Sequence, residues 1–358
     1  MARLGEICRK ITDGSHNPPH GIEHSEYLML SSKNIFDDEI TLDDPRYLSE
    51  ENFLAENKRT EIEHGDVLLT IVGTVGRAAV VPASIQNICL QRSVAVIKPN
   101  CEIVIPRFLM YQLQNMRPFL EKEARGVAQK GIYLKQVENL EVKILSHEEQ
   151  AEIVEHLDKV NDLISLRKRQ LTKLDELVKA RFVELFDGKG YPTLKWNEVF
   201  NTTTGKLDSN AMVENGEYPF FTCAKEVFRI DKYAFDQEAL LLAGNNAAGK
   251  YDVKYYKGKF NAYQRTYVLG LKEDWSYQLF RYQLEDKLVY LQQQSLGGLT
   301  KYLTLKILGE LEFIVPPMDK QNEFTAFVEQ TDKSKLAIQQ SLDKLETLKK
   351  ELMQGYFG

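Results

Sequence analysis

Tyr111-Gln112-Leu113 returns as Tyr282-Gln283-Leu284, 171 residues further along the chain. At the same offset, and without a gap, the whole segment 107–187 aligns with 278–358. The other matched pairs include Leu120/Leu291, Gly126/Gly297, Lys130/Lys301, Leu140/Leu311, Glu141/Glu312, Gln150/Gln321 and Glu152/Glu323. Self-similarity over such a length is typical of a fold that contains one structural unit twice.

The segments before this repeat also correspond, at shifted offsets. Gln91-Arg92-Ser93-Val94 resembles Gln264-Arg265-Thr266-Tyr267, and Glu6-Ile7 resembles Glu198-Val199. The chain therefore consists of a domain, a helix, a second domain and a second helix. The predicted boundaries are 1–145 for the first domain, 146–188 for the first helix, 189–316 for the second domain and 317–358 for the second helix.

Two segments have the apolar spacing of a heptad repeat, with steps that alternate between four and three residues. Arg167 interrupts the first stripe, Thr331 and Lys335 interrupt the second, and glycines close both segments. The predicted stripe residues are Ile153, Leu157, Val160, Ile164, Leu171, Leu174, Val178 and Leu185, then Phe324, Val328, Ile338, Leu342, Leu345, Leu348 and Leu352. We expect the two helices of one chain to pair with each other, while a generic dimerisation coiled coil is the alternative.

The segments outside the helices contain short β-type runs, such as 67–72, 93–97 and 239–243, broken by Gly, Asn and Pro. The sequence thus predicts an α+β fold. We expect two α/β-mixed domains separated by two long antiparallel coiled-coil helices, with a pseudo-twofold internal repeat.

Composition limits the classes of function. The net charge is −6, so any nucleic-acid binding has to come from local basic clusters. No apolar run approaches the roughly 20 residues that span a bilayer, and no signal peptide is evident, so we expect a cytoplasmic protein without a membrane partner. The four cysteines are scattered, which favours reduced, mostly buried thiols over a disulfide framework or a metal site. They are Cys8, Cys89, Cys101 and Cys223.

The loops contain the residue types that contact nucleic acid. Arg and Lys suit guanine, Asn and Gln suit adenine, and Ser, Thr and Lys suit phosphates. The candidates in the first domain are Lys10, Ser15, His16, Asn17, Thr74, Arg77, Gln91, Arg92, Gln129 and Lys130. The candidates in the second domain are Lys206, Lys225, Asn245, Asn246, Lys250, Gln264, Arg265, Thr300 and Lys301. Each of them also has a plain interpretation as a solvated surface residue, and both Gln-Arg pairs could be strand residues.

Three motifs resemble catalytic or metal-binding sites but are incomplete. Asn17-Pro18-Pro19-His20 lacks the aromatic residue of amino-methyltransferases, and the near P-loop 244–251 has Tyr251 where Ser or Thr would hold magnesium. Pro18 and Pro19 prevent the helix that would align His16, His20 and His24. We therefore expect no catalytic residue, no metal and no cofactor on this chain.

Several motifs together resemble the specificity subunit of type I restriction-modification enzymes, over the whole chain. They are Ile11-Thr12-Asp13-Gly14-Ser15-His16-Asn17-Pro18-Pro19, the segment 65–76, the segment 140–153 and its second copy around 311–321. The second domain departs from the first, because Thr202-Thr203-Thr204-Gly205-Lys206 occupies the place of the Asp-Gly-Ser-His motif. Contacts cannot therefore be transferred from one domain to the other.

The resemblance implies a mechanism. Each domain would be a target-recognition domain that reads one half of a split site in double-stranded DNA, while the helices fix the distance between the halves. Two methyltransferase subunits would dock, bring S-adenosylmethionine and flip an adenine. Restriction subunits would join them, so that S-adenosylmethionine, ATP and Mg are expected only on partners. The alternatives are a coiled-coil scaffold without a DNA role and a degenerate methyltransferase.

Overall fold

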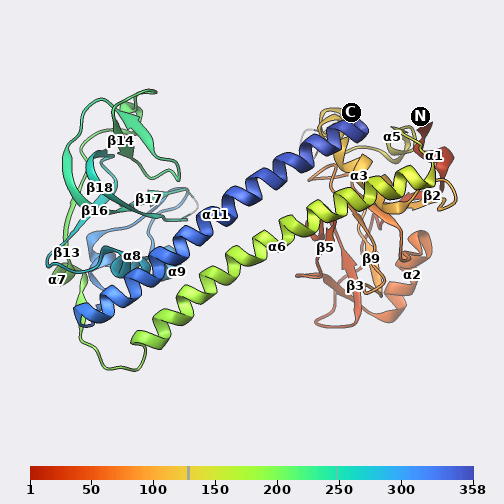
Figure 1. The fold of residues 1–358 in the computed structure, drawn as a ribbon. Helices are drawn as coiled ribbons and strands as arrows, with labels where there is room; N and C mark the ends of the chain where they lie inside the picture. Colours follow the sequence, from red (N-terminus) through yellow and green to blue (C-terminus); the bar gives the residue numbers. More distant parts are fainter. Residues whose placement is uncertain (127–129, 248) are drawn as a thin grey trace. The chain divides into compact units, whose positions relative to one another are not determined.

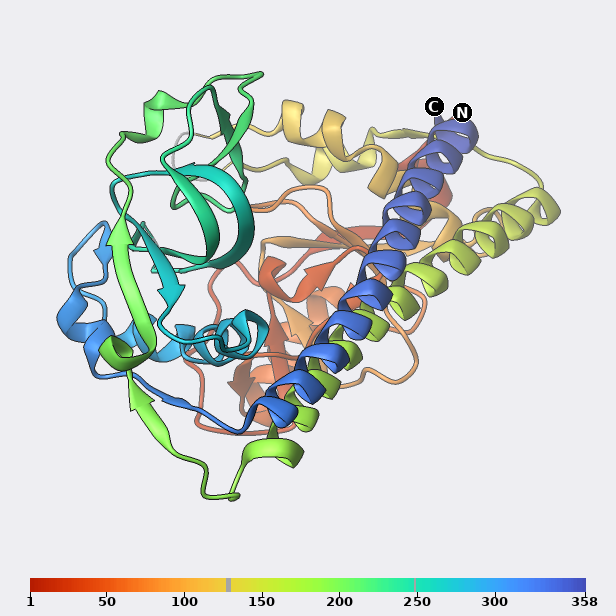
Figure 2. The same ribbon diagram turned by 60° about the vertical axis from the view of Figure 1, so that its left-hand side comes forward.

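The computed structural model describes residues 1–126, 130–247 and 249–358, so the candidate Gln129 lies outside the described residues. The chain divides into two compact units, which are Met1–Lys168 with Gln340–Gly358 and Arg169–Gln339. Each unit contains one mixed domain and a part of both long helices, α6 (His147–Phe186) and α11 (Met318–Phe357) (Figures 1 and 2). The units therefore share each helix, where the sequence predicted four consecutive segments.

The first unit contains a four-stranded antiparallel sheet in the order β2-β10-β7-β8 and a three-stranded sheet in the order β6-β3-β9. The strands are β2 (Cys8–Asp13), β3 (Tyr27–Leu30), β6 (Arg46–Leu48), β7 (Val67–Thr70), β8 (Ala78–Val80), β9 (Ile88–Leu90) and β10 (Val94–Pro99), with the short pairs β1 (Ala2–Arg3)/β11 (Glu141–Val142) and β4 (Ile35–Phe36)/β5 (Glu39–Ile40). The helices are α1 (Leu4–Ile7), α2 (Glu50–Thr60), α3 (Pro106–Asn115), α4 (Arg117–Glu123) and α5 (Leu134–Glu138).

The second unit contains a six-stranded sheet in the order β13-β19-β16-β18-β14-β15. Its strands are β13 (Phe200–Thr204), β14 (Tyr218–Phe221), β15 (Phe228–Ile230), β16 (Phe235–Ala243), β18 (Val253–Ala262) and β19 (Thr266–Leu271), with the pairs β12 (Thr193–Lys195)/β21 (Glu312–Ile314) and β17 (Asn245–Asn246)/β20 (Lys301–Tyr302). The helices are α7 (Trp196–Val199), α8 (Tyr277–Asp286), α9 (Leu288–Gln294) and α10 (Leu305–Gly309). The larger sheet means that the two domains differ most in their β parts.

The internal repeat is present helix by helix. The pairs α3/α8, α4/α9, α5/α10 and α6/α11 begin and end at residues that are 171 positions apart. The matched glutamines have equivalent roles. Gln112 exchanges two hydrogen bonds with the backbone of Lys143, and Gln283 does the same with Ile314. The sequence match therefore reflects a buried polar framework as well as apolar periodicity.

Both units contain segments of α6 and α11 that run antiparallel. In the first unit, Arg167 Nε donates to Ser341 Oγ (3.2 Å) and His156 contacts Tyr356. In the second unit, Asp175 pairs with Lys335, and Arg181 pairs with Glu323. In each unit the residue numbers rise along one helix as they fall along the other, as the sequence predicted.

The predicted apolar stripe of α11 is wrong at one position. Leu348 has a side chain that is 42% exposed, whereas its neighbour Lys349 is half-buried. The alternation of four and three continues through the buried Thr331 and the half-buried Lys335, whose ammonium group pairs with Asp175 (2.5 Å). The prediction chose the apolar Leu348 where strict heptad spacing points to Lys349. Polar side chains that have partners can occupy the buried stripe of a helix.

The thiols also differ from expectation. All four cysteines are free, but only Cys89 is fully buried, and Cys101 is exposed. Burial raises the pKa of Cys8 and of Cys89 to about 12, so both stay protonated at neutral pH. Within the described residues, no helix is both long and apolar enough to cross a membrane.

Candidate nucleic-acid interface

Three chain segments meet at one edge of the first domain, beyond the ends of β2, β7 and β9. The Ser15 amide donates to Leu90 O (2.7 Å), and the Arg92 amide donates to Ser15 O (2.9 Å). The Ile71 amide donates to Ser93 O (2.9 Å), and the Gly73 amide donates to Lys130 O (3.1 Å). We call these segments, 14–17, 71–74 and 91–93 with Lys130, the first loop edge. It brings together seven of the predicted residues, which are Ser15, His16, Asn17, Thr74, Gln91, Arg92 and Lys130.

A glycine fixes this edge in each domain. A Cβ on Gly14 would lie 2.0 Å from the carbonyl oxygen of Leu90, and one on Gly205 would lie 1.8 Å from that of Ala262. Both contacts are with backbone, which cannot move aside as a flexible side chain can. The glycine of the Asp-Gly-Ser-His motif therefore has a structural role that Gly205 repeats in the second domain.

The aspartate of the same motif orients the side chains of His16 and Arg59. Asp13 is 6% exposed, and its carboxylate binds His16 Nε2 (2.8 Å) and the guanidinium of Arg59. Arg59 Nε also donates to Thr12 Oγ1 (3.3 Å). Asp13 is thus too deeply placed to contact a large ligand, whereas His16 and Arg59 remain accessible.

A cavity of about 420 Å³ opens at the first loop edge. Its polar lining is Asp13, His16, Arg59, Arg92, Arg125 and Tyr133, over an apolar floor that includes Ile71, Val72 and Ile132. Three guanidinium groups from distant parts of the chain therefore converge in a protein whose net charge is negative. Sequence analysis found His16 and Arg92 but missed Arg59, Arg125 and Tyr133. Arg59 lies in the last turn of α2, outside the loops in which the contacts were predicted.

The second domain has a corresponding edge with different chemistry. Asn245 and Asn246 in β17 pair with Tyr302 and Lys301 in β20, so three predicted residues lie together. Asn246 Oδ1 also accepts the Lys250 amide (3.3 Å). A cavity of about 520 Å³ lies beside Asn245, and its lining is Ser209, Asn210, Met212, Thr222, Cys223, Ala224, Phe228, Asn245 and Tyr263. This lining has hydroxyl and amide groups where the first cavity has guanidinium groups.

The matched Gln-Arg pairs need a correction of one residue. Both pairs lie in turns between strands, because the segments after β9 and β18 reverse there. The Arg92 amide donates to Ser15 O, and the equivalent bond runs from the Gln264 amide to Leu207 O (2.9 Å). Arg92 therefore corresponds to Gln264, and Gln91 corresponds to Tyr263. The sequence match aligned the two pairs on residue identity, which places the second pair one residue out of the register that the strands define.

Some predicted contacts lie away from the two edges or have other partners. Lys10 pairs with Glu61 (3.8 Å), and the Arg77 guanidinium stacks over the Phe36 ring (4.8 Å). The Gln264 amide group donates to Asp208 Oδ1 (3.0 Å). The remaining candidates have exposed side chains, and they are Lys206, Lys225, Arg265 and Thr300.

The near P-loop does not have the geometry of a nucleotide site. Asn245–Asn246 form a strand, Tyr251 is buried, and the strand β18 follows where a P-loop would have a helix. Within the described residues, no three His, Cys, Asp or Glu side chains form a group suited to a metal ion.

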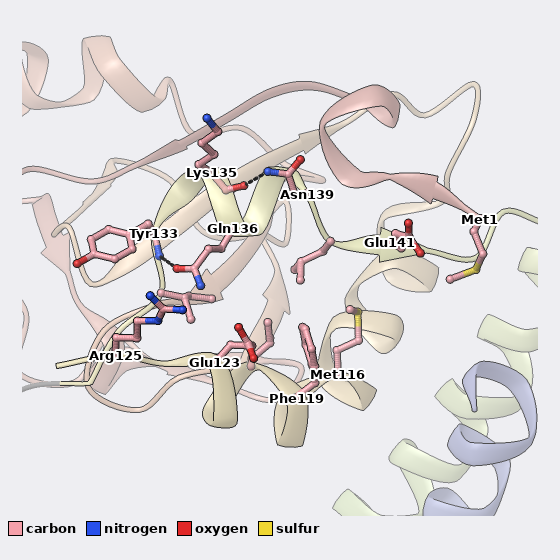
Figure 3. A pocket seen from close by; sticks show the side chains of 13 residues that line it. Met1, Met116, Phe119, Glu123, Arg125, Tyr133, Lys135, Gln136, Asn139 and Glu141 are labelled. Atoms are coloured by element: carbon pink, nitrogen blue, oxygen red, sulfur yellow. Dashed lines mark hydrogen bonds between the residues drawn. The ribbon is translucent and has the colours of Figure 1, made fainter.

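A second, mainly apolar pocket of about 980 Å³ lies on the first unit, over α4 and α5, and shares Arg125, Ile132 and Tyr133 with the first cavity (Figure 3). Met1, Met116, Phe119 and Tyr133 line it, and the Phe119 side chain is 52% exposed. The repeat position of Phe119 in the second unit is Tyr290 on α9, which is 44% exposed among other exposed apolar residues. These neighbours are Val289, Leu296 and Leu305. We call the two surfaces the apolar patches.

Comparison with known proteins gives one consistent result. A protein-family model described as "Type I restriction modification DNA specificity domain" matches the chain twice, at residues 24–176 and 189–349. The type I restriction enzyme EcoDI specificity subunit of Escherichia coli is 34% identical over 161 residues, which is 44% of this chain and 34% of that protein. The EcoBI specificity subunit of Escherichia coli is 31% identical over 215 residues, 58% of this chain and 44% of that protein. The chain thus aligns with less than half the length of either relative.

Solved structures share the fold at low sequence identity. The S subunit of a type I restriction-modification system from M. genitalium superposes with a TM-score of 0.65 and 14% identity, covering 100% of this chain and 95% of that one. A chain from a structure of complex assembly in the type I R-M system gives a TM-score of 0.52 and 16% identity, covering 99% and 96%.

Proposed function

Since the chain belongs to the family of type I restriction-modification DNA specificity domains, we propose that it is the subunit that selects the DNA sequence and contributes no catalytic group of its own. The observation that carries this proposal is the pair of loop edges. The same backbone frame occurs twice, and different polar side chains occupy equivalent positions. A frame of this kind suits a reader of two unlike half-sites in double-stranded DNA.

The equivalent positions differ in charge as well as in size. The first edge presents Arg92 where the second presents Gln264, and Ser15 where the second presents Leu207. Guanidinium groups favour guanine edges and phosphates, whereas amides favour adenine. We therefore expect a split, asymmetric site whose first half is contacted mainly by guanidinium groups and whose second half is read mainly by amide and hydroxyl groups.

Catalysis would come from partner subunits. Two methyltransferase subunits would bring S-adenosylmethionine and flip the target adenine, and restriction subunits would bring ATP and Mg. The repeat supports two copies of one partner, because each unit has an apolar patch at the same repeat position. Several exposed apolar side chains on one part of a surface are typical of protein–protein contacts.

Methylome sequencing tests the proposal. We expect cells that carry this chain and its partner methyltransferase to methylate adenine in a split, asymmetric motif. Deleting this chain alone should abolish that motif, and a plasmid copy of the chain should restore it. A motif that persists without the chain would contradict the proposal. A chain that binds methyltransferase subunits but no duplex, at any salt concentration, would favour the scaffold alternative.

A charge in either apolar patch should remove one docked methyltransferase subunit. Phe119→Glu would leave an unpaired carboxylate in the interface of the first unit, and Tyr290→Glu would do the same in the second. Native mass spectrometry of the purified complex should show two methyltransferase copies with the wild type, one with either variant and none with the double variant.

The matched control is Leu54→Glu, an equally exposed leucine on α2, away from the patches. It should retain two methyltransferase copies. If the two patch variants also retain two copies, docking takes place elsewhere, while the DNA-recognition proposal stands.

A further inference from the structure

Arg59 is the most constrained of the arginines in the first cavity. We propose that its guanidinium reads a guanine in the first half-site, and that Asp13 and Thr12 are positioning residues that hold it in the reading orientation. The inference rests on the proposed function and adds to it a base, a side chain and the mechanism that orients that side chain.

The backbone beneath Arg59 is rigid. The helix α2 begins at the cap Ser49, whose hydroxyl accepts the Asn52 amide (3.3 Å), and it ends at Glu61 in a left-handed conformation (φ 45°). Phe53 and Thr60 anchor the helix because both are buried. The Cα of Arg59 thus has a fixed position above β2, which contains Thr12 and Asp13.

The guanidinium itself is held along one edge. Of its five N–H groups, Nε donates to Thr12 Oγ1, and Nη2 donates to Asp13 Oδ1. Both acceptors are buried, yet 51% of the Arg59 side chain is exposed. Within the described residues Arg59 has no other hydrogen bond. Its remaining N–H groups therefore include a neighbouring pair on Nη1 and Nη2, directed away from the two acceptors.

Such a pair matches the O6 and N7 acceptors that guanine presents in the major groove. Recognition of a base requires a fixed orientation of the side chain, which the two acceptors provide before DNA arrives. Arg92 and Arg125 line the same cavity, and within the described residues neither side chain has a hydrogen bond or an ion pair. Exposed guanidinium groups that no acceptor holds in place suit phosphates, which carry no sequence information.

The arrangement is confined to the first domain. Gly205 corresponds to Gly14, so Thr204 stands at the position of Asp13 and cannot form the same ion pair. Changes at Arg59 are therefore expected to alter one position of one half-site. The second half-site serves as an internal reference in the same experiment.

Binding of DNA by the complex with its methyltransferase subunits provides the test. Duplexes would carry the wild-type methylated motif, with each guanine of the split site replaced in turn. The wild-type complex should bind more weakly whenever a guanine that it recognises is replaced. Arg59→Ala should become indifferent at one guanine of one half-site, where discrimination falls about 5- to 150-fold, and should still discriminate at all others.

Two further variants separate positioning from folding. Thr12→Val keeps the shape of the side chain and should weaken discrimination at the same guanine, with a smaller fold-change than Arg59→Ala. Arg92→Ala is the matched control for a phosphate contact, and it should weaken binding to all duplexes equally and reduce the salt slope by about 1.

The outcomes are distinct. If Arg59→Ala instead weakens all duplexes equally, Arg59 is a phosphate contact and the inference is wrong. The inference is also wrong if both Arg59→Ala and Thr12→Val discriminate against every guanine replacement as strongly as the wild type does. If Arg59→Ala does not fold, Thr12→Val decides by the position at which discrimination falls. A wild-type complex that shows no sequence preference would instead refute the proposed function.

Discussion

Replacing Gln150 or Gln321 with leucine is expected to weaken the packing of a long helix against the domain of its own unit. Gln150 accepts the Ile105 amide (2.8 Å) and donates to Ile103 O and Leu145 O (both 2.9 Å). Gln321 accepts the Ser276 amide (2.9 Å) and donates to Pro316 O (2.8 Å).

Both side chains are buried, so leucine would leave backbone groups without partners and without water. Each unsatisfied group costs about 1–3 kcal/mol. We therefore expect a loss of about 3 kcal/mol or more for Gln150→Leu, and about 2 kcal/mol or more for Gln321→Leu.

Hydrogen–deuterium exchange measures the loss in each unit separately, which matters because a chain of two units need not unfold in one step. Gln150→Leu should lower protection in peptides of the first unit, and Gln321→Leu should lower it in the second. Gln330→Leu, at an exposed position of α11, is the control and should change stability by at most about 0.5 kcal/mol. If Gln150→Leu and Gln321→Leu keep the protection of the wild type, as the control should, the buried glutamines do not have this structural role.

These two glutamines also explain why the architecture was predictable. A residue that satisfies buried backbone groups in one copy does so again in the other, so Gln150 and Gln321 stay matched at a constant offset. The long helices were predictable for a similar reason, since their spacing of four and three follows from helix geometry. Helix spacing can be read from neighbouring residues, and the internal repeat can be read by aligning two segments of the same chain.

The site was less predictable, because its contacts join residues that are distant in sequence. Nothing near Asp13 indicates that Arg59 is its partner, and nothing near Arg125 indicates that it reaches the same cavity. The shift of one residue between Arg92 and Gln264 has another cause. Turn sequences diverge while the strands that they join keep their spacing, and hydrogen bonds between strands are visible only in the fold.

The motif 65–76 contributes Asp66 to a buried ion pair with Lys98. Asp66 Oδ2 lies 2.7 Å from Lys98 Nζ, and both side chains are buried within the first unit. Lys98 Nζ also donates to Glu61 O (2.6 Å), and Asp66 accepts the Glu63 amide (2.8 Å). Burial raises the pKa of Asp66, while the Lys98 ammonium and the Glu63 amide act in the opposite direction.

Asp66→Ala should destabilise the first unit by about 3–5 kcal/mol, because it removes the buried carboxylate that pairs with Lys98 and leaves only the more distant and exposed carboxylate of Glu63 (3.5 Å). Adding Lys98→Met removes that charge and keeps most of the side-chain volume, so the double variant should recover most of the loss. Hydrogen–deuterium exchange of β7 and β10 peptides measures both effects, and the second unit should be unchanged.

The double variant separates two causes. If it recovers nothing, the loss comes from the Glu63 amide, which has lost its acceptor, and not from the charge of Lys98. The position of the pair also links stability to recognition. β7 leads from Asp66 to Ile71 and Val72 in the floor of the first cavity, and β10 leads from the turn containing Arg92 to Lys98. Asp66→Ala should therefore weaken DNA binding through the first half-site at temperatures where the chain is still folded, and the double variant should restore it.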